Sequence, residues 1–169
     1  PPALRRLWIV GPADGVDLGC WHPLAYRLAG NPHAGLALMR SLLNDMVTRR
    51  QAMRVAGIDC CREPSEQFPH QFLVMDEIPE LTLNEDRKVA QEACLLLARI
   101  RRVGRKTGTS IFAITQDQSR DVVPTSISRI FSHRICFKVS NYRETDMILP
   151  GARAQGWHPE KFDPAHPGR

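Results

Sequence analysis

Several features that would place a chain in a specialised class are missing from this sequence. No apolar run approaches the roughly 20 residues that a helix needs to cross a bilayer, and the opening residues do not form a signal peptide. The five cysteines are an odd number, and none is spaced like the ligands of a zinc site. The sequence therefore argues against a membrane span, a disulfide-rich secreted domain and a structural zinc centre.

A phosphate-binding loop of the form G-x-x-x-x-G-K-[ST] is also missing, as are internal repeats and low-complexity tracts. What is present is an ordinary globular composition, with 43% hydrophobic and 24% charged residues in 169 positions. This length suits about one domain. The formal net charge of +5 permits a polyanionic partner such as nucleic acid, although many unrelated domains are equally basic.

Hydrophobic periodicity and capping residues predict an alternation of strands and helices. Asn31 fits the start of a long helix that Gly57 stops, and Gly104 fits the end of a second helix. Asn141 and Glu144, three residues apart, resemble a capping pair. Such alternation predicts an α/β fold with a mainly parallel sheet and helices on both faces. We expect strands at 7–10, 72–75, 110–115 and 134–139, and helices at 32–56, 85–103, 125–131 and 141–149.

Two carboxylates follow the apolar strand 72–75 directly, at Asp76 and Glu77. Buried parallel strands end at the carboxyl edge of a sheet, where ligands bind in open α/β folds. A carboxylate at this edge can hold magnesium beside bound phosphates, and a second one can orient or deprotonate an attacking water. This is the Walker B arrangement. An acidic pair after a strand is equally typical of a solvated loop, so the pair alone does not decide between the two.

Two further signals lie downstream. Thr115 and Gln116 end the next buried strand, and a right-handed crossover would place them at the same edge as Asp76. A glutamine there can contact a terminal phosphate or position water, but it also suits a polar strand end. Arg134 opens the last expected strand and could reach the phosphate of a neighbouring subunit, or it could be a plain surface arginine.

The order and spacing of these pieces resemble the FtsK/SpoIIIE family of ring-forming DNA translocases. The resemblance covers most of residues 7 to 160, and the tail GARAQGWHPEKF is most similar to the actinobacterial plasmid-transfer (TraB-like) branch. The matching stretches are LWIVGPADGVDLGCW, FLVMDEIPEL, LARIRRVGRKTGTSIFAITQ and ISRIFSHRICFKVSNYRETDMIL.

The resemblance implies a three-layer RecA-like P-loop ATPase core with ATP and Mg²⁺ as cofactors. Asp76 would hold Mg²⁺ through water, Glu77 would be the catalytic base, and Gln116 would sense the nucleotide state with Thr115 as a nucleotide contact. Arg134 would be the arginine finger, with Arg129 as the second candidate. Double-stranded DNA would be the partner.

The resemblance also implies an organisation for the parent protein. Residues 1–169 would be a single motor domain fragment, truncated at both ends, with the Walker A loop upstream of residue 1. Six copies would form a cytoplasmic ring, and any membrane anchor would lie in segments absent here. Two departures stand out: the loop Gly11-Pro12-Ala13-Asp14-Gly15 lacks the lysine common in the family, and the DNA-end-recognition winged helix is absent.

Two alternatives remain open at the level of the sequence. The same fold could belong to a type VII secretion ATPase, which engages polypeptide instead of DNA. The domain could also be a non-hydrolysing structural ring module. The intact Asp76, Glu77 and Gln116 favour an enzyme, and the residues upstream would discriminate by the presence or absence of a Gly-Lys-Ser/Thr sequence.

Overall fold

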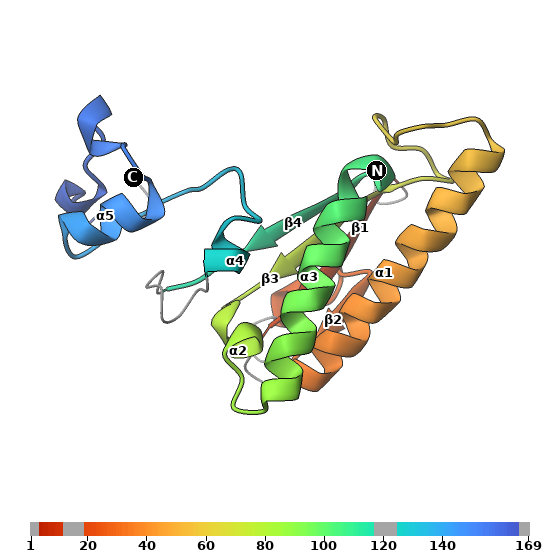
Figure 1. The fold of residues 1–169 in the computed structure, drawn as a ribbon, viewed down its shortest axis with the longest axis horizontal. Coiled ribbons are helices and arrows are strands. Elements are labelled where there is room, and N and C mark those ends of the chain that lie inside the picture. The colour runs from red at the N-terminus through yellow and green to blue at the C-terminus, as the bar shows by residue number, and fades with distance from the viewer. Residues whose placement is uncertain (1–3, 12–18, 117–124, 166–169) are drawn as a thin grey trace. The chain divides into compact units, whose positions relative to one another are not determined.

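The computed structural model describes residues 4–11, 19–116 and 125–165, which form two compact units, Pro1–Gln116 and Asp117–Arg169. The first unit is a parallel sheet covered by two long helices (Figure 1). The second is built from short helices and irregular chain. No helix among the described residues is long and apolar enough to cross a membrane.

All strands of the sheet run parallel, in the order β2-β1-β3-β4. The predicted α/β class with a mostly parallel sheet is therefore confirmed, and so is the adjacency of the strands predicted at 72–75 and 110–115. The sequence reading missed β2, because three residues are too few to show an alternating pattern. The strands are β1 (Arg5–Val10), β2 (Arg27–Ala29), β3 (His70–Met75) and β4 (Thr109–Ala113).

Two long helices confirm the periodicity of the sequence. Helix α1 spans Pro32–Val55, and the side chain of Asn31 caps it by accepting a hydrogen bond from the backbone of Ala34 at 2.9 Å. Helix α3 spans Arg87–Thr107. The short helix α2 (Pro79–Thr82) and the 3-10 turn η2 (Gly19–Trp21) lie in connections.

The predicted end of α3 at Gly104 was wrong. The helix continues to Thr107 and is followed by Gly108, whose φ of 69° is the left-handed conformation that glycine adopts without strain. Gly104 instead allows a close approach of two elements. A Cβ atom at this position would lie 2.7 Å from the carbonyl oxygen of Thr109, the first residue of β4.

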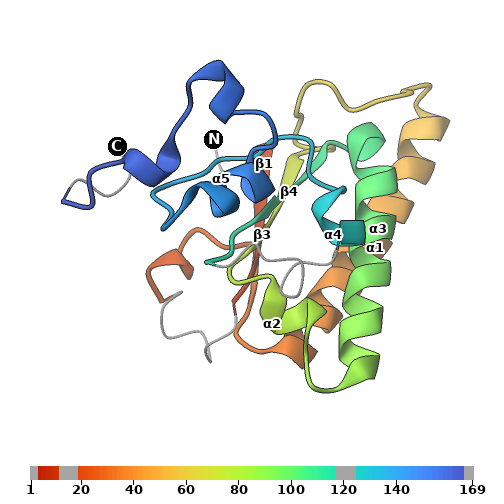
Figure 2. The same ribbon diagram turned by 60° about the vertical axis from the view of Figure 1, so that its left-hand side comes forward.

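Helices α1 and α3 lie on the same face of the sheet (Figure 2). The reason is the handedness of the crossovers: β2 to β3 and β3 to β4 move in the same direction across the sheet, so right-handed connections place both helices on one side. The expectation that helices bury both faces of β3 was therefore wrong for this unit. Leu73 and Met75 are fully buried under the helices, whereas Phe72 and Val74 on the other face are only half-buried.

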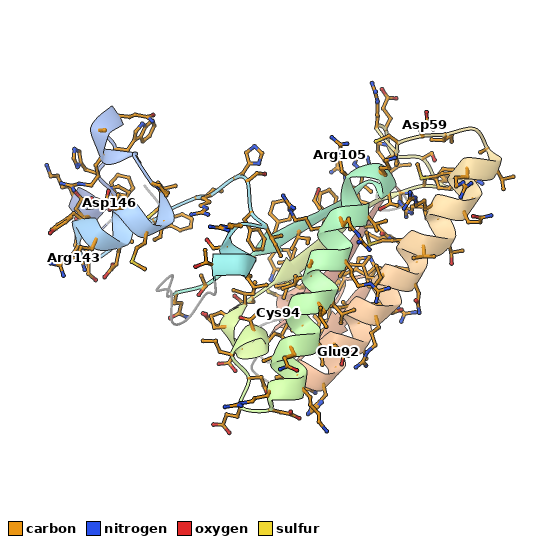
Figure 3. The ribbon with its side chains drawn as sticks, in the orientation of Figure 1. Asp59, Glu92, Cys94, Arg105, Arg143 and Asp146 are labelled. Carbon is orange, nitrogen blue, oxygen red and sulfur yellow. The ribbon has the colours of Figure 1, made fainter. Side chains whose placement is uncertain are left out.

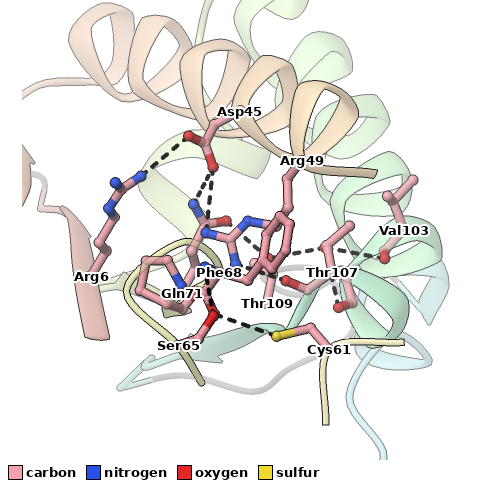
Figure 4. Close-up of polar contacts among 12 residues, drawn as sticks. Arg6, Asp45, Arg49, Cys61, Ser65, Phe68, Gln71, Val103, Thr107 and Thr109 are labelled. Carbon is pink, nitrogen blue, oxygen red and sulfur yellow. Dashed lines mark hydrogen bonds and ion pairs between the residues drawn. The ribbon is translucent and has the colours of Figure 1, made fainter. Parts of the chain in front are cut away.

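A buried polar network joins the helices to the amino-terminal ends of the strands (Figure 4). The guanidinium of Arg49, on α1, donates to the backbone carbonyls of Pro69 and Thr107, and it lies 3.8 Å from the carboxylate of Asp45. Burial lowers the pKa of Arg49, and the charge of Asp45 opposes this effect. Asp45 also accepts a hydrogen bond from the buried Gln71 of β3. The network fixes the register of α1 against the sheet, because an unpaired buried cation would be costly.

The second unit contains α4 (Thr125–Ser128), α5 (Tyr142–Ile148) and the 3-10 turns η3 (Arg153–Gln155) and η4 (Pro159–Lys161). The capping pair at the start of α5 is confirmed. The side chain of Asn141 accepts from the backbone of Glu144 at 3.2 Å, and the carboxylate of Glu144 accepts in return from the backbone of Ser140 at 2.9 Å.

The strand predicted at 134–139 was wrong, because this segment has no regular secondary structure. Its alternating apolar residues suit a strand, but a strand needs a hydrogen-bonded neighbour, and the described part of the second unit supplies none. Ile135 and Phe137 are accordingly 83% and 63% exposed.

Glu160 holds η4 against α5. Its carboxylate accepts a hydrogen bond from the hydroxyl of the buried Thr145 at 2.8 Å and lies 3.1 Å from the imidazole of His158. The bond from Thr145 is the main cause that lowers the pKa of Glu160 to about 2. Burial opposes this effect, and a backbone hydrogen bond and then the contact with His158 add to it. Glu160 is therefore ionised at neutral pH.

Candidate functional site

The candidate site lies where β1, β3 and β4 end, at the carboxyl edge of the sheet. The chain continues the pairing past the last ladder residues. The backbone amide of Asp76 donates to Val10 at 2.8 Å, and that of Ile114 donates to Met75 at 2.9 Å. The amide of Ile78 then donates back to Ile114 at 3.0 Å. These bonds fix the loops that carry the polar residues, because each backbone group has a defined partner.

Glu77 is bound to the end of β4. Its carboxylate accepts a hydrogen bond from the hydroxyl of Thr115 at 2.9 Å and another from the backbone amide of Gln116 at 3.2 Å. The prediction that the residues after β3 and β4 emerge at the same edge is therefore confirmed. These hydrogen bonds do not test the catalytic roles of the residues, which stay predictions.

The backbone of Glu77 has a φ of 51°, which makes it the only described non-glycine residue in the left-handed region. This conformation costs about 1–2 kcal/mol for a residue with a side chain. A hydrogen bond to a charged group contributes about 1.5–3 kcal/mol, so the two bonds to Glu77 are large enough to offset the strain. The strained turn and the two donors together point the carboxylate in one direction. Such strain concentrates at functional sites.

Asp76 is half-buried beside Glu77, and no described side chain donates to its carboxylate. Three or more His, Cys, Asp or Glu side chains gathered around one point do not occur among the described residues. A single carboxylate still fits Mg²⁺, because this ion is usually held by one or two carboxylates together with substrate phosphates and water. The donor set therefore suits a metal that arrives with a nucleotide.

Arg134 has a different environment from the one that its proposed role suggested. Its guanidinium is half-buried and donates to the carbonyl of Ile148 at 3.1 Å, with a longer contact of 3.4 Å to the carbonyl of Met147. It also donates to the carbonyl and the hydroxyl of Ser128, at 3.2 and 3.1 Å. These groups include the last carbonyls of α4 and α5, which have no partner within their helices. Arg134 thus ties two helix ends together inside the second unit.

Arg129 is the more accessible of the two arginine-finger candidates. It is exposed, one residue beyond the end of α4, and forms no ion pair with a described carboxylate. A guanidinium that acts across a subunit boundary must be able to reach outward. The geometry of the single chain therefore favours Arg129 over Arg134 for that role, which stays a prediction for both.

The sequence predicted that Thr115 contacts the nucleotide, but it did not predict the hydrogen bond from Thr115 to Glu77. The strand register would have predicted this bond. Met75 is paired with Ala113, and continuing the parallel register by two residues brings Glu77 opposite Thr115. A hydroxyl and a carboxylate in such positions can bond across the strand ends. The loop 12–18 after β1, where the family lysine was sought, lies outside the described residues.

Comparisons with known proteins agree with the motifs, although no family model matches the chain. DNA translocase FtsK of two Helicobacter pylori strains is 29% and 30% identical over 166 residues, which is 92% of this chain. DNA translocase FtsK of Chlamydia trachomatis is 31% identical over 93 residues, which is 54% of this chain. The chain spans about a fifth of the length of the Helicobacter proteins, or 19%.

Two solved structures share the fold. The pCW3 conjugation coupling protein TcpA, in its monomer form with ATPγS, matches with a TM-score of 0.74 at 18% identity, over 91% of this chain and 46% of TcpA. The cytoplasmic domain of the Thermomonospora curvata type VII secretion ATPase EccC matches with a TM-score of 0.65 at 19% identity, over 94% of this chain and 20% of EccC. Their fold is that of RecA-like P-loop ATPase motors. Over most of its length the chain is therefore a homologue of the FtsK/SpoIIIE-type DNA translocases, as its motifs predicted.

Proposed function

We propose that this chain carries the catalytic sheet edge of an ATP-driven motor that moves double-stranded DNA. The observation that supports the proposal most directly is the Glu77 carboxylate, held by Thr115 and Gln116 beside Asp76 at the carboxyl edge of a parallel sheet. The DNA cargo rests on the relatives, which are named as DNA translocases at about 30% identity. Because the chain spans only a fifth of those proteins, the activity belongs to the full-length molecule.

In this proposal each residue at the carboxyl edge of the sheet has its own role in ATP hydrolysis. Glu77 accepts the proton of the attacking water, and its two donors keep it aimed at that water. Asp76 would hold Mg²⁺, and the ion would supply positive charge to neutralise the phosphates. Gln116 follows β4 and contacts the terminal phosphate. The sequence contains no phosphate-cradling loop of its own, so the proposal requires one from the rest of the protein.

The proposal also requires several copies. Motors of this kind place ATP between neighbouring subunits, and six copies would close a ring around the duplex. Arg129 would then stabilise the charge that develops on the nucleotide of the next subunit, a contribution of about 10³–10⁵ in rate where such fingers act in trans.

Replacing Glu77 by Gln in the full-length protein tests the catalytic assignment. The amide keeps the shape of the side chain but cannot accept a proton at neutral pH, so ATP should still bind while turnover falls about 10²–10⁴-fold. Glu80→Gln is the matched control, because Glu80 is an exposed carboxylate on the neighbouring α2. Calorimetry measures nucleotide binding, and phosphate release with and without duplex DNA measures turnover.

Near-normal hydrolysis by Glu77→Gln would remove Glu77 from the role of base. A second outcome concerns the cargo. If wild-type turnover responds to an unfolded polypeptide and not to duplex DNA, the motor is a polypeptide translocase and the DNA part of the proposal is wrong.

A further inference from the structure

The second unit contains a pocket that the proposed mechanism does not use. The pocket has a volume of about 590 Å³, and its walls come from the chain after α4 and from the stretch between the end of α5 and Trp157. These walls are largely apolar and include Phe131, Ile148 and Leu149. Trp157 is 63% exposed, although tryptophan is usually well buried in a folded protein. Hollows of this size commonly bind a ligand.

One positive charge lies in the wall of this pocket, at Arg134. The hydrogen bonds of its guanidinium go to carbonyls and one hydroxyl of α4 and α5, which are neutral groups. Arg134 forms no ion pair with any carboxylate among the described residues. A half-buried guanidinium without a counter-ion favours an anion beside it. The pocket therefore suits an apolar group that has a carboxylate next to it.

The first unit has a loop of matching chemistry, residues 83–86 between α2 and α3. Leu83 is 44% exposed, and the exposed Glu85 forms no ion pair with any described residue. The side chain of Asn84 donates to a backbone carbonyl of α2 at 3.1 Å and accepts from the backbone amide of Asp86 at 3.1 Å. The loop thus holds its own shape, which lowers the entropy cost of binding.

The position of this loop distinguishes it from another exposed apolar residue beside an acid, Ile58, which precedes Asp59. Asp59 lies beyond the end of α1, at the end of the first unit opposite to α2 (Figure 3). The 83–86 loop instead lies close to the candidate site. Helix α2 begins two residues after Glu77, and the backbone amide of Glu80 donates to the carbonyl of Glu77 at 3.1 Å. A partner that holds this loop is therefore brought near the carboxyl edge of the sheet.

We infer that the pocket of the second unit receives the 83–86 loop of a neighbouring copy of this chain. Leu83 of the neighbouring copy packs on Trp157, and its Glu85 faces Arg134. Interfaces draw most of their binding energy from a few residues, among which tryptophan and arginine are especially common. The inference rests on the proposed function, since it takes several copies acting together.

This contact also serves the proposed arginine finger. Arg129 lies two residues before Phe131, which is part of the pocket wall. Both residues belong to the turn that follows α4, where the backbone amide of Phe131 donates to Ser128 at 3.3 Å. A second unit that holds the loop of its neighbour therefore brings Arg129 toward Glu77 of that neighbour. The contact gives a structural reason why hydrolysis should need the adjacent copy.

Disulfide cross-linking between two kinds of full-length subunits tests the contact. One kind carries Leu83→Cys, and the other, made longer by a fused tag, carries Gln155→Cys in the exposed part of the pocket wall. The control replaces Leu83→Cys by Leu95→Cys, because Leu95 is another exposed leucine of the first unit, on α3. The native cysteines are the same in every mixture. With ATPγS and mild oxidation, we expect the mixed disulfide dimer in the test and its loss in the control, since a disulfide needs Cα atoms within about 7 Å.

A second variant measures the strength of the contact. Leu83→Arg removes the apolar group and places a cation beside Arg134, so the concentration at which half of the full-length subunits assemble should rise about tenfold or more. Turnover should fall with assembly, while each subunit keeps its affinity for ATPγS. Leu95→Arg should leave assembly and turnover unchanged. Light scattering measures assembly, and both leucines are exposed, so neither variant should disturb folding.

The failure of the inference and the failure of the proposed function give different results. Equal cross-linking in test and control, or no cross-linking in rings that light scattering shows to form, would overturn the inference. If those rings still hydrolyse ATP in response to duplex DNA, the motor stands and only the contact is wrong. If the wild-type protein stays monomeric with ATPγS and duplex DNA, the several copies that the motor requires are missing, and the inference falls with the proposed function.

Discussion

Glu77 combines a strained backbone with a charged side chain that two donors hold. The turn is held by the backbone bond from Ile78 to Ile114, and the two bonds to the carboxylate fix the direction of the side chain. The hydroxyl of Thr115 is therefore a positioning group for Glu77. Catalytic groups must be held close to their productive geometry, and a small misplacement is costly in rate.

We predict that Thr115→Val lowers turnover about tenfold or more in the full-length protein, since misplacement of a catalytic group can cost up to about 10²-fold. Valine keeps the shape of threonine and removes the hydroxyl that donates to Glu77 at 2.9 Å. Thr115→Ser keeps the hydroxyl and should restore most of the rate. Steady-state kinetics with a separate measurement of ATP affinity checks this. Equal turnover in the Val and Ser variants would contradict the positioning role, and a selective loss of ATP affinity would support a direct nucleotide contact.

Helix α3 links the core of the first unit to the candidate site. Its buried stripe packs on the sheet, and its last turn leads directly into β4. Gly104 sets the distance between the helix and β4, because its missing Cβ leaves room for the Thr109 carbonyl. The position of β4 in turn sets the position of Thr115 and Gln116. A change at Gly104 should therefore shift the residues of the candidate site.

Gly104→Ala should destabilise the α3–β4 region by about 1–3 kcal/mol, as overpacking of a tight site does. This expected loss of stability is opposite to the usual effect, since alanine normally stabilises a helix interior by about 1 kcal/mol relative to glycine. Gly35→Ala in α1 is the comparison: its Cβ would meet a methyl group of Val10 at 2.8 Å, not a backbone carbonyl. Hydrogen exchange of the α3 and β4 amides measures both. Slower exchange in Gly104→Ala would contradict the packing argument.

In the proposed motor, residues of different subunits would meet at the nucleotide, and the catalytic arginine should be found there. Arg134 donates to carbonyls at the ends of α4 and α5, so its loss should loosen the second unit. Arg129 is exposed and has no described ion-pair partner. We therefore expect different effects when each of these two arginines is replaced by alanine.

We predict that full-length Arg129→Ala subunits and Glu77→Gln subunits, each inactive alone, regain part of the ATPase rate when mixed. At a mixed boundary the intact Glu77 of one subunit is served by the intact Arg129 of its neighbour. Arg134→Ala should instead reduce the protection of α5 from hydrogen exchange. Phosphate release by the mixed rings is the measurement. An inactive mixture, in rings shown by mass to contain both subunits, would exclude the trans role of Arg129.

The sequence by itself determined the features that depend on neighbours in the chain. Helix caps such as Asn31 and Asn141 act within one turn, and the acidic pair Asp76-Glu77 marks the end of an apolar strand. The parallel order of strands follows from their alternation with helices, because a crossover has a preferred hand. For this reason the α/β class, the main helices and the edge that carries the candidate site could be predicted.

Only the tertiary structure decided the features that depend on distant partners. The same glycine stops a helix or admits a neighbouring carbonyl, and only the position of β4 distinguishes these roles for Gly104. In the sequence, Arg134 suits either an arginine finger or a structural arginine that binds helix ends. Only its acceptors on α4 and α5 distinguish these two roles. The apolar alternation of residues 134–139 predicts a strand, yet a strand forms only beside another strand. Hydrogen bonding and packing depend on which residues meet in space, and the sequence does not show which distant residues will meet.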